Sequence, residues 1–452
     1  MALEVTVGID IGTTSVKALA VDGDGSVAAR ARVGHQLLAS HAGELAHPAG
    51  AAWRDGVLGA LRDVQADPDG PRAGLDIRAV SVAAMVPSLC AVDGGGRPIS
   101  PGLLYGDERG AGAEDRASAS SGELVRFLAW LVQANPDAAG YWPAQAVANA
   151  ALSGIGAIDT IVAFTAAPLF DFTGWDPAVA DAVGLHDITR LPRIVAGSDP
   201  VGKVRAAGDA TLGAGTIDAL GEQLVAGADG DGDVLVILGS TLIVWAVTPT
   251  WLEVDGLWTV PHTAPGKWLI GGPSNAGGLF LNWVAAALGV DLWQGRPRPP
   301  DPGRVPVWQP YLRGERVPFH DPSRRASVHD LDIGMGADAI VRAAYEASAF
   351  AVRHQLDLAG VAASRIVATG GGVRDRAWVQ ALADGTGLAV DVVAVPEGAA
   401  LGAAWLARQT VGLEAAGADA SGWARTARRV EPDDRWARAA AERYTRYRDL
   451  AG

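Results

Sequence analysis

The amino-terminal residues alternate between apolar runs and turn residues as a β-meander does. From Val5 to Asp10 apolar and polar positions alternate, and the segment from Gly12 to Ser15 has the glycine and hydroxyl residues of a tight turn. A second apolar run from Val16 to Asp22 leads into another turn that is rich in glycine and aspartate. This pattern predicts three consecutive strands that end near Ala31.

The same order of strand, turn and strand returns about half a chain later. A β-branched run from Asp233 to Leu238 is followed by the turn Gly239-Ser240-Thr241 and by a second run from Leu242 to Val247. A repeated unit at this separation indicates an internal duplication. We therefore predict two related α/β domains, residues 1–230 and 231–452, that face each other across a cleft, with the boundary in the Gly/Asp-rich stretch 227–232.

Apolar periodicity predicts further elements between and after the two repeated units. Buried strands are expected at 79–84, 158–164, 365–369 and 391–395. Helices are expected at 122–133, 277–288, 337–358, 375–383 and 398–409, and the last forty residues, rich in Arg and Ala, predict a solvated terminal helix. Strands and helices mixed in this way predict an α/β fold.

Composition and charge limit the kinds of molecule that the protein is expected to bind. The chain has 452 residues, of which 49% are hydrophobic and 19% charged, as in a globular protein. With 37 Lys and Arg residues against 51 Asp and Glu residues, the net charge of −14 disfavours nonspecific binding to nucleic acids or to anionic membranes. We therefore expect a small-molecule substrate, no nucleic-acid or membrane partner, and a homodimer as the candidate assembly.

Cysteine usage and the amino-terminal residues indicate the compartment. Cys90 is the single cysteine, so no internal disulfide forms, and no cluster of Cys and His has the spacing of a zinc site. The first residues lack the basic start and apolar run of a signal peptide, and no apolar run is long enough to span a membrane. We expect a cytoplasmic protein.

The two predicted turns carry phosphate-binding chemistry. Asp10 ends the first strand, and the turn Gly12–Ser15 can direct N–H groups and hydroxyls at phosphate oxygens while Asp10 holds a hydrated Mg²⁺. An ordinary hairpin with a polar tip is the alternative, and the second copy at Gly239–Thr241 favours phosphate binding. Two such turns facing one cleft predict a clamp for the two ends of a polyphosphate.

Two further acidic segments carry candidate chemistry, with a structural alternative for each. Asp218 follows a predicted strand and precedes small residues, so it suits either a general base that takes a proton from a substrate hydroxyl or the N-cap of a helix. Asp107 and Arg109, between glycines, suit either contacts to sugar hydroxyls or a salt-bridged surface loop. The residues alone leave both pairs of alternatives open.

Glycine-rich segments mark two places where the backbone can approach a flat ligand such as a nucleobase. The run Gly370-Gly371-Gly372 lies between a predicted strand and a predicted helix, and Gly277-Gly278 is followed by Asn282 one helical turn later. A triple glycine is common in proteins, so it becomes informative only in combination with the phosphate turns.

Taken together and in this order, the motifs resemble those of the FGGY carbohydrate kinases, the group that contains xylulokinase, gluconokinase and glycerol kinase. The most specific matches are YLRGERVPFHDPSRRA at 311–326 and IVATGGGVRDRAWVQALADGTGLAV at 366–390. Further matching stretches, at 8–22, 102–110, 215–227, 236–247, 277–283 and 397–407, extend the resemblance over nearly the whole chain.

The resemblance implies two actin-like, RNase H-like domains, ATP and Mg²⁺ as cofactors, and a set of site residues. It assigns Asp218 as the catalytic base, in preference to the N-cap, and places Asp10 with Asp218 around the Mg²⁺. It assigns Asp107 and Arg109 to the sugar. The residues that it implies for ATP are Gly12, Thr13, Thr14, Ser15, Lys17, Gly239, Ser240, Thr241, Gly278, Asn282, Gly371, Gly372 and Asp375.

The sugar site departs from the xylulokinase pattern. Xylulokinases usually carry a Gln-Met-His stretch that touches the sugar, whereas this chain has Ala84-Met85-Val86, so Met85 is the candidate contact that remains. The implied reaction is in-line transfer of the γ-phosphoryl group to a primary hydroxyl. The expected substrate is a pentulose such as xylulose, with a sugar acid or a polyol as the alternative. A catalytically silent actin-like sensor is the rival from another class, and Asp10, Asp107 and Asp218 argue against it.

Overall fold

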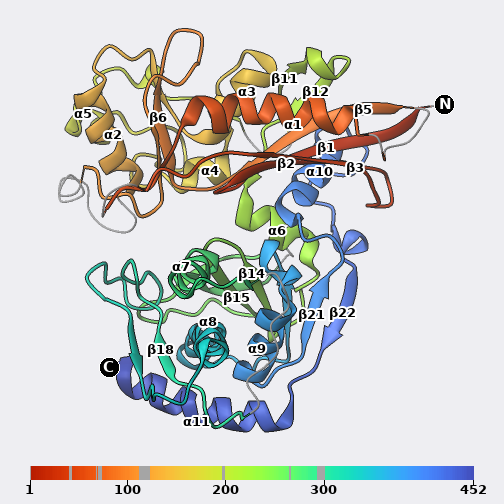
Figure 1. Ribbon diagram of the computed structural model, residues 1–452. Coiled ribbons are helices and arrows are strands. Elements are labelled where there is room, and N and C mark those ends of the chain that lie inside the picture. The colour runs from red at the N-terminus through yellow and green to blue at the C-terminus, as the bar shows by residue number, and fades with distance from the viewer. Residues whose placement is uncertain are drawn as a thin grey trace. The chain divides into compact units, whose positions relative to one another are not determined.

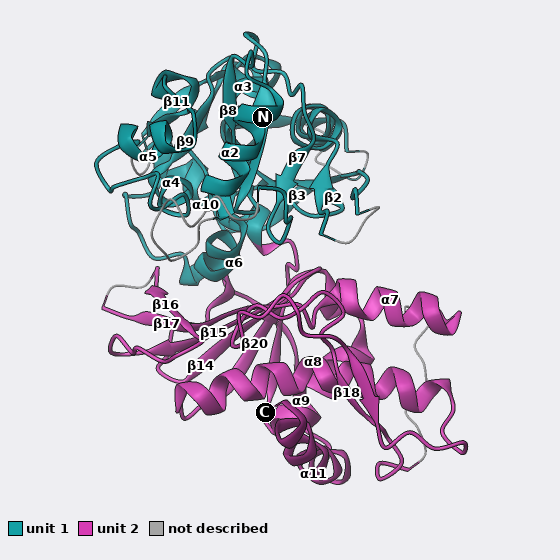
Figure 2. Ribbon diagram, turned by 90° about the vertical axis from the view of Figure 1, so that its left-hand side faces the viewer, with its two compact units in different colours: residues 1–225, 399–423 teal, residues 226–398, 424–452 magenta. Residues whose placement is uncertain are grey.

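The computed structural model describes residues 2–39, 43–67, 69, 74–110, 123–195, 199–263, 266–292 and 301–451. The chain forms two compact units (Figure 2). Unit 1 contains Met1–Val225 and Ala399–Trp423, and unit 2 contains Ala226–Gly398 and Ala424–Gly452. The division at residue 225 lies close to the expected boundary, but residues 399–423, which were expected in the second domain, pack with unit 1.

The sheet of unit 1 begins with the predicted meander. Strands β1 (Leu3–Ile11), β2 (Ser15–Val21) and β3 (Val27–Gly34) pair antiparallel in sequence order. Beyond β1 the sheet continues with β5 (Leu75–Ala84), β12 (Ala210–Gly213) and β11 (Pro200–Val204), and β13 (Thr216–Ile217) also pairs with β5. Both β1 and β12 run parallel to β5, and β11 is an antiparallel edge strand.

The sheet of unit 2 repeats this order. It consists of β14 (Asp233–Leu238), β15 (Leu242–Thr248), β16 (Trp258–Pro261), β17 (Trp268–Ser274), β20 (Arg365–Thr369), β21 (Val390–Val393) and β22 (Thr426–Val430). β20 and β21 continue in parallel from β14, and β22 is an antiparallel edge. The order β3-β2-β1-β5-β12-β11 thus recurs as β17-β15-β14-β20-β21-β22, which confirms the predicted duplication.

Helices and short strands complete both units (Figure 1). In unit 1 these are β4 (Ala46–His47), η1 (Gly50–Asp55), α1 (Gly56–Gln65), β6 (Ser88–Val92), β7 (Gly102–Leu104), α2 (Glu123–Ala134), β8 (Gly140–Trp142), α3 (Ala144–Ser153), β9 (Ala157–Asp159), α4 (Thr160–Phe164), α5 (Pro177–Ala182), η3 (Ile188–Arg190), β10 (Arg193–Val195), η4 (Arg205–Ala207), α6 (Asp218–Ala226), α10 (Gly398–Thr410) and η7 (Ser421–Trp423). In unit 2 they are α7 (Gly278–Leu288), β18 (Val307–Gln309), β19 (Ser327–His329), α8 (Ala337–Ala359), η6 (Gly371–Arg374), α9 (Arg376–Thr386) and α11 (Asp434–Ala451).

Two of the predicted elements were wrong in part. The segment 158–164, expected as one strand, is β9 followed by α4, because the Asp159 carboxylate accepts the N–H groups of Ile161 and Val162 and caps a helix there. The terminal helix α11 is not simply solvated, because Trp436 and Tyr447 are buried within unit 2. Because α11 is rich in arginine, its composition did not reveal the apolar residues that pack into unit 2.

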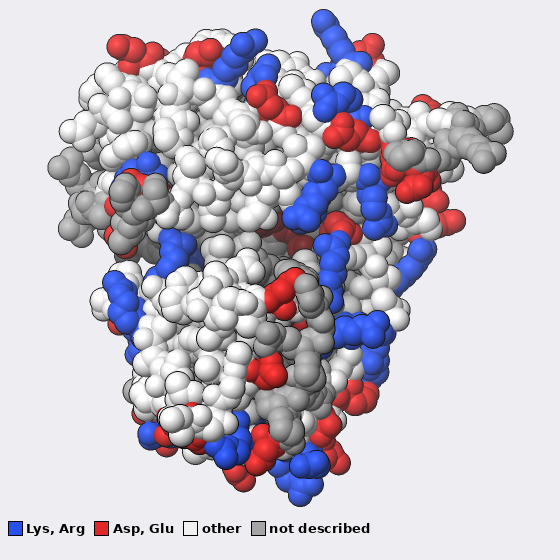
Figure 3. Space-filling view, viewed as in Figure 1, with Lys and Arg blue, Asp and Glu red and all other residues white. Residues whose placement is uncertain are grey.

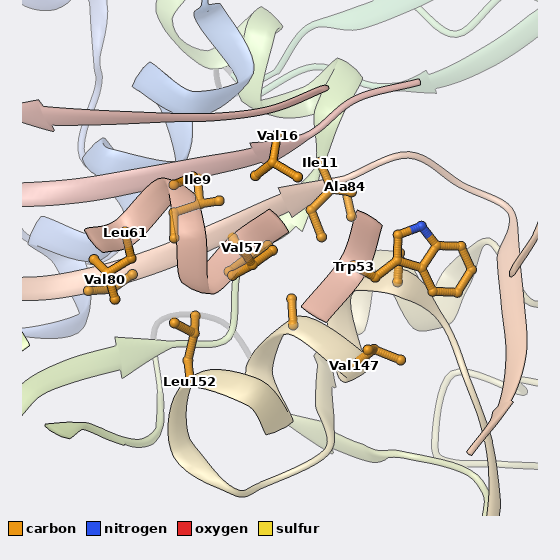
Figure 4. Packing of buried hydrophobic residues seen from close by; sticks show 14 of the residues in the cluster. Ile9, Ile11, Val16, Trp53, Val57, Leu61, Val80, Ala84, Val147 and Leu152 are labelled. Atoms are coloured by element: carbon orange, nitrogen blue, oxygen red, sulfur yellow. The ribbon is translucent and has the colours of Figure 1, made fainter. Parts of the chain in front are cut away.

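The core of unit 1 lies between the sheet and the helices α1 and α3. Figure 4 shows Val57 and Leu61 of α1 packed near Ile9 of β1, with Val147 and Leu152 of α3 on the other side of the cluster. The odd-numbered residues of β1, from Val5 to Ile11, all belong to this core. Alternation along a strand therefore directs the even-numbered residues of β1 to the opposite face of the sheet.

The opposite face of β1 packs against the small-residue helix α10. The hydroxyl of Thr6 donates to the Ala404 carbonyl at 2.9 Å. A Cβ at Gly8 would lie 1.8 Å from the Ala400 carbonyl oxygen, so only glycine allows the helix backbone to approach the strand this closely. This contact explains why residues 399–423 belong to unit 1.

Charged side chains of both signs are interspersed on the face shown in Figure 3. Within the described residues, no helix combines the length and the apolarity that crossing a membrane requires. Cys90 is buried in unit 1 with a free thiol.

The contact between β1 and α10 predicts a strong effect of one methyl group. Gly8→Ala should lower the free energy of unfolding by about 3 kcal/mol, because backbone atoms of α10 cannot yield to the new side chain. Gly50→Ala is the matched control, since a Cβ there meets no atom within 4 Å, and its effect should stay below about 1 kcal/mol. Urea denaturation measures both variants, and equal stabilities would contradict the close packing of α10 on β1.

Candidate active site

Three candidate residues of unit 1 lie at one edge of its sheet. Asp10 in β1 pairs with Ala83 in β5, and Thr216 in β13 pairs with the same residue from the other side. All three strands run parallel, so Asp10, Met85 and Asp218 reach the sheet edge together. At a strand spacing of about 4.8 Å, the backbones of β1 and β13 lie about 10 Å apart.

Asp10 forms an ion pair with its cross-strand neighbour. Lys17 Nζ donates to Asp10 Oδ2 at 2.9 Å, and the carboxylate is buried. A Cβ at Gly12 would lie 3.7 Å from Asp10 Oδ2 and 3.9 Å from Lys17 Nζ, so the start of the turn sits directly on the pair.

The residues at this edge fit an Mg²⁺ ion that arrives with a nucleotide. Within the described residues, no group of three or more His, Cys, Asp or Glu side chains could form a complete protein cage for a metal. Mg²⁺ is usually held by one or two carboxylates together with substrate phosphates. The side chains of Asp10 and Asp218 supply two carboxylates at this edge of the sheet.

The carbonyl groups of the turn Gly12–Ser15 are all held by hydrogen bonds. His35 Nε2 contacts the Gly12 carbonyl oxygen at 3.1 Å, and the His35 backbone N–H donates to the Thr14 carbonyl oxygen at 3.0 Å. His47 Nε2 contacts the Thr13 carbonyl oxygen at 2.8 Å. In a trans peptide the N–H points away from the carbonyl, so the N–H groups of Thr13 and Thr14 face the opposite side of the turn. Such an array of N–H groups suits an anion.

The candidate sugar residues form a buried ion pair beside this turn. Asp107 is 0% exposed, and Arg109 donates to both of its carboxylate oxygens, from Nε at 2.8 Å and from Nη2 at 2.6 Å. The Leu45 N–H donates to the same carboxylate at 2.8 Å. The loop is joined to the phosphate turn, because the hydroxyls of Tyr105 and Thr13 are 3.0 Å apart.

Within this pair, Arg109 retains the exposed surface. Its side chain is 20% exposed and its guanidinium lies 5.2 Å from the ring centroid of Trp130. The hydrogen bonds to Asp107 raise the pKa of Arg109. Asp107 is therefore enclosed by the protein, whereas Arg109 keeps surface that can reach a ligand. Met85, by contrast, is buried in the hydrophobic core.

Asp218 begins helix α6 immediately after β13. Its side chain is partly exposed, and Oδ1 accepts the N–H of Ala219 at 2.7 Å. This contact is to the next residue, whereas an N-cap carboxylate accepts an N–H group two or three residues further on. A partly exposed carboxylate at this edge of the sheet can accept a proton.

The second turn, Gly239–Thr241, supports the start of helix α7. The N–H of Gly278 donates to the Gly239 carbonyl at 2.8 Å, and the N–H of Leu279 donates to the Ser240 carbonyl at 3.0 Å. Asn282 lies exposed one helical turn further along α7. Two backbone hydrogen bonds therefore join the helix start to the turn.

The triple glycine lies beside this turn. Ile237 of β14 pairs with Thr369 of β20 in parallel, so both strands lead to the same edge of the sheet of unit 2. A Cβ at Gly371 would meet no atom within 4 Å, which leaves open space above it, whereas a Cβ at Gly372 would lie 2.3 Å from the Trp378 ring. Gly372 is thus needed for packing, and Gly371 borders space that a ligand can use.

Asp375 has a structural role in unit 2. Its Oδ1 accepts the N–H groups of Ala377 at 2.9 Å and Trp378 at 3.2 Å, which caps helix α9. Its Oδ2 accepts the hydroxyl of Tyr345. Both carboxylate oxygens are therefore engaged within the protein, and a contact of Asp375 to a nucleotide stays a prediction.

Three residues that support the two turns were not singled out from the sequence. His35 and His47 hold the first turn, and no local pattern marks them, because His35 lies in a loop, His47 lies in the short strand β4, and both are far from the turn in sequence. Glu315 supports the second turn: it accepts the Ser274 hydroxyl at 2.7 Å and the Asn275 N–H at 2.8 Å. Ser274 pairs with Leu242, which directly follows the turn. The stretch 311–326, which carried the family resemblance, contains Glu315.

Comparisons with known proteins agree with this architecture. The C-terminal domain of the FGGY family of carbohydrate kinases matches residues 234–409. A xylulose kinase of Streptomyces rubiginosus is 30% identical over 438 residues, which cover 88% of this chain and 86% of that relative.

Two solved structures resemble the whole chain. The gluconate kinase of Lactobacillus acidophilus superposes with a TM-score of 0.79 at 20% identity and covers 99% of this chain and 98% of its own. A ligand-bound xylulose kinase of the same organism superposes with a TM-score of 0.80 at 19% identity and the same coverage of 99% and 98%. These likenesses, with the duplicated sheet, confirm the predicted actin-like α/β fold.

The support of the second turn predicts a pH dependence of stability. Burial raises the pKa of Glu315 to about 7 from 4.5, so between these values the folded protein keeps a proton that the unfolded chain releases. Stability from this group is therefore lost as pH rises across that window, with a slope of up to about 1.4 kcal/mol per pH unit. Urea unfolding of the native protein and of Glu315→Gln between pH 5 and pH 7 measures the difference. A difference that stays constant with pH would show that the carboxyl is ionised throughout.

Proposed function

Because the chain belongs to the FGGY family of carbohydrate kinases, we propose that it transfers the γ-phosphoryl group of ATP to a hydroxyl of a pentulose. The observation that carries the proposal is the edge of the unit 1 sheet. Asp10, the turn Gly12–Ser15 and Asp218 meet there, and the Tyr105 hydroxyl joins the loop of Arg109 to the turn. A carboxylate, phosphate-directed N–H groups and a sugar-directed loop are thus within one site.

Asp218 acts as the general base. Its carboxylate is partly exposed at the carboxyl end of β13, so it can take the proton of the acceptor hydroxyl as the phosphoryl group is transferred. Removing this proton makes the oxygen a better nucleophile, and holding the hydroxyl in line with the phosphate supplies most of the remaining rate increase. Asp107 contributes indirectly, because it fixes the guanidinium of Arg109 toward the sugar.

Each unit has its own backbone groups for binding phosphate. In unit 1 the N–H groups of Thr13 and Thr14 bind phosphate oxygens, and Lys17 adds a positive charge beside Asp10. Asp10 and Asp218 would hold Mg²⁺, and the ion would supply positive charge to the phosphates of ATP. In unit 2 the turn Gly239–Thr241 offers backbone groups to phosphate oxygens, and the open space at Gly371 accepts the adenosine.

The charges around Arg109 favour a neutral sugar over a sugar acid. Asp107 already neutralises Arg109, and Glu123 pairs with Arg126 at 3.3 Å. Glu44 also interacts electrostatically with Arg109. A substrate carboxylate would therefore meet an arginine whose charge is compensated, with a further acid nearby. The xylulose kinase relative supports the same choice, and gluconate, named for one structural neighbour, is the second candidate.

A cytoplasmic location is part of the proposal. The single cysteine, Cys90, is buried with a free thiol, as in proteins of a reducing compartment.

A substrate panel tests the choice of a neutral sugar. With ATP and Mg²⁺, coupled ADP release should give a kcat/KM for one pentulose at least about 10-fold above that for gluconate, because like charges repel an acid from the loop of Arg109. The panel also contains polyols, such as glycerol, and it contains several hexuloses as a separate class. A preference for gluconate would overturn the pentulose assignment while leaving the kinase intact. ATP binding without turnover of any sugar would favour a silent sensor.

A single substitution tests the general base. Asp218→Asn should keep ATP binding, measured by calorimetry, and lower kcat by about 100-fold or more, because the amide cannot accept the proton. Asp76→Asn is the control, since Asp76 is an exposed acid at the opposite end of β5. Turnover of Asp218→Asn close to that of the control would remove Asp218 from this role.

A further inference from the structure

Two histidines and a tryptophan support the first turn from the side opposite its N–H groups. His35 and His47 contact the carbonyl oxygens of Gly12 and Thr13, and their rings meet edge to face with centroids 4.4 Å apart. His47 is fully buried, and Trp53 Nε1 donates to its Nδ1 at 2.9 Å. Trp53 belongs to the hydrophobic core (Figure 4), so the support extends from the turn into the core of unit 1.

The contacts of His47 determine which of its nitrogens carries the proton. The indole N–H of Trp53 is only a donor, so Nδ1 of His47 must be the acceptor. Nε2 therefore carries the hydrogen and donates it to the Thr13 carbonyl oxygen at 2.8 Å. Burial, together with neighbouring His35, lowers the pKa of His47 to about 4, so the ring is neutral near pH 7.

Holding these carbonyls has a consequence for the amides that follow them. The peptide of Gly12 and Thr13 cannot rotate while His35 holds its oxygen, and the peptide of Thr13 and Thr14 is held in the same way by His47. Their N–H groups are thereby fixed on the far side of the turn. A hydrogen bond to a carbonyl also polarises the peptide, which makes its N–H a stronger donor.

We propose that His47 is a positioning residue for phosphate binding, which holds the turn so that the N–H groups of Thr13 and Thr14 face a polyphosphate. His35 performs the same task one peptide earlier, and Trp53 fixes the tautomer of His47. This inference rests on the proposed function, because it takes the turn as the phosphate site. Neither histidine touches the substrate.

Two substitutions at His47 separate the contact to the turn from the contact to the core. Asn places its amide at the position of Nδ1, so His47→Asn keeps an acceptor for Trp53 and loses the donor to Thr13. Gln places its amide nitrogen at the position of Nε2, so His47→Gln keeps the donor to Thr13 and loses the acceptor for Trp53. His47→Asn should therefore weaken ATP binding about 10-fold, and His47→Gln should recover most of the affinity.

The measurement is calorimetric titration with ATP·Mg²⁺ and with adenosine, followed by steady-state kinetics. We expect His47→Asn to lose affinity for ATP and to raise the KM for ATP, while its affinity for adenosine is unchanged because adenosine has no phosphate. His186→Asn is the control, since His186 is an exposed histidine of unit 1. A purely structural role would instead lower melting temperature in both His47 variants and affect adenosine and ATP alike.

If His47→Asn does not fold, the same pair of substitutions at His35 still tests whether the contact to the turn positions its N–H groups. His35 is only partly buried, so His35→Asn and His35→Gln should both fold, and only the asparagine variant should weaken ATP binding. Equal ATP affinity of the asparagine and glutamine variants would overturn the inference. If the native protein binds ATP but phosphorylates no sugar, the proposed function fails, whereas the ATP affinities of the variants still test the histidines.

Discussion

The parallel pairing of β1 with β5, and of β14 with β20, is the constraint on which both candidate sites depend. Parallel strands bring their carboxyl ends to one edge of a sheet, and the hairpin turn that follows the first strand of each unit lies at that edge. In unit 1 the edge receives Asp10 from β1 and Asp218 from β13. In unit 2 the turn Gly239–Thr241 and the triple glycine lie at the corresponding edge of the sheet. The duplication of the fold therefore produces two turns in equivalent positions.

In each unit, buried polar groups hold neighbouring parts of the protein in place, and partly exposed groups keep surface that can contact a substrate. A buried polar group, whether charged or neutral, is stable only when its hydrogen bonds are made within the protein. Asp107, Asp375 and Glu315 are of this kind, and each holds a neighbour, a helix start or a strand end. Asp218 and Arg109 keep exposed surface and can meet a substrate. Burial thus separates the residues that build the site from those that can contact a ligand.

Local patterns predicted the elements that carry both turns, and failed where a side chain acted on its own backbone. The runs 233–238 and 365–369 are strands with those same bounds, because β-branched residues suit a strand buried on both faces. The segment 158–164 has an equally apolar pattern, but Asp159 caps a helix within it. The family resemblance identified the candidate site residues, yet it could not indicate that Asp107 is saturated by Arg109.

The sequence by itself determined the duplicated order of strands, the two glycine-hydroxyl turns and the family, because these depend on short-range patterns and on motifs that persist in similar chains. Only the tertiary structure decided that residues 399–423 pack with unit 1. Glycine is required at position 8 because a helix almost 400 residues away in the sequence packs against it. The tertiary structure alone also brought His35 and His47 beneath the first turn. Contacts between such distant residues are set by how sheets and helices pack, and no local pattern records that packing.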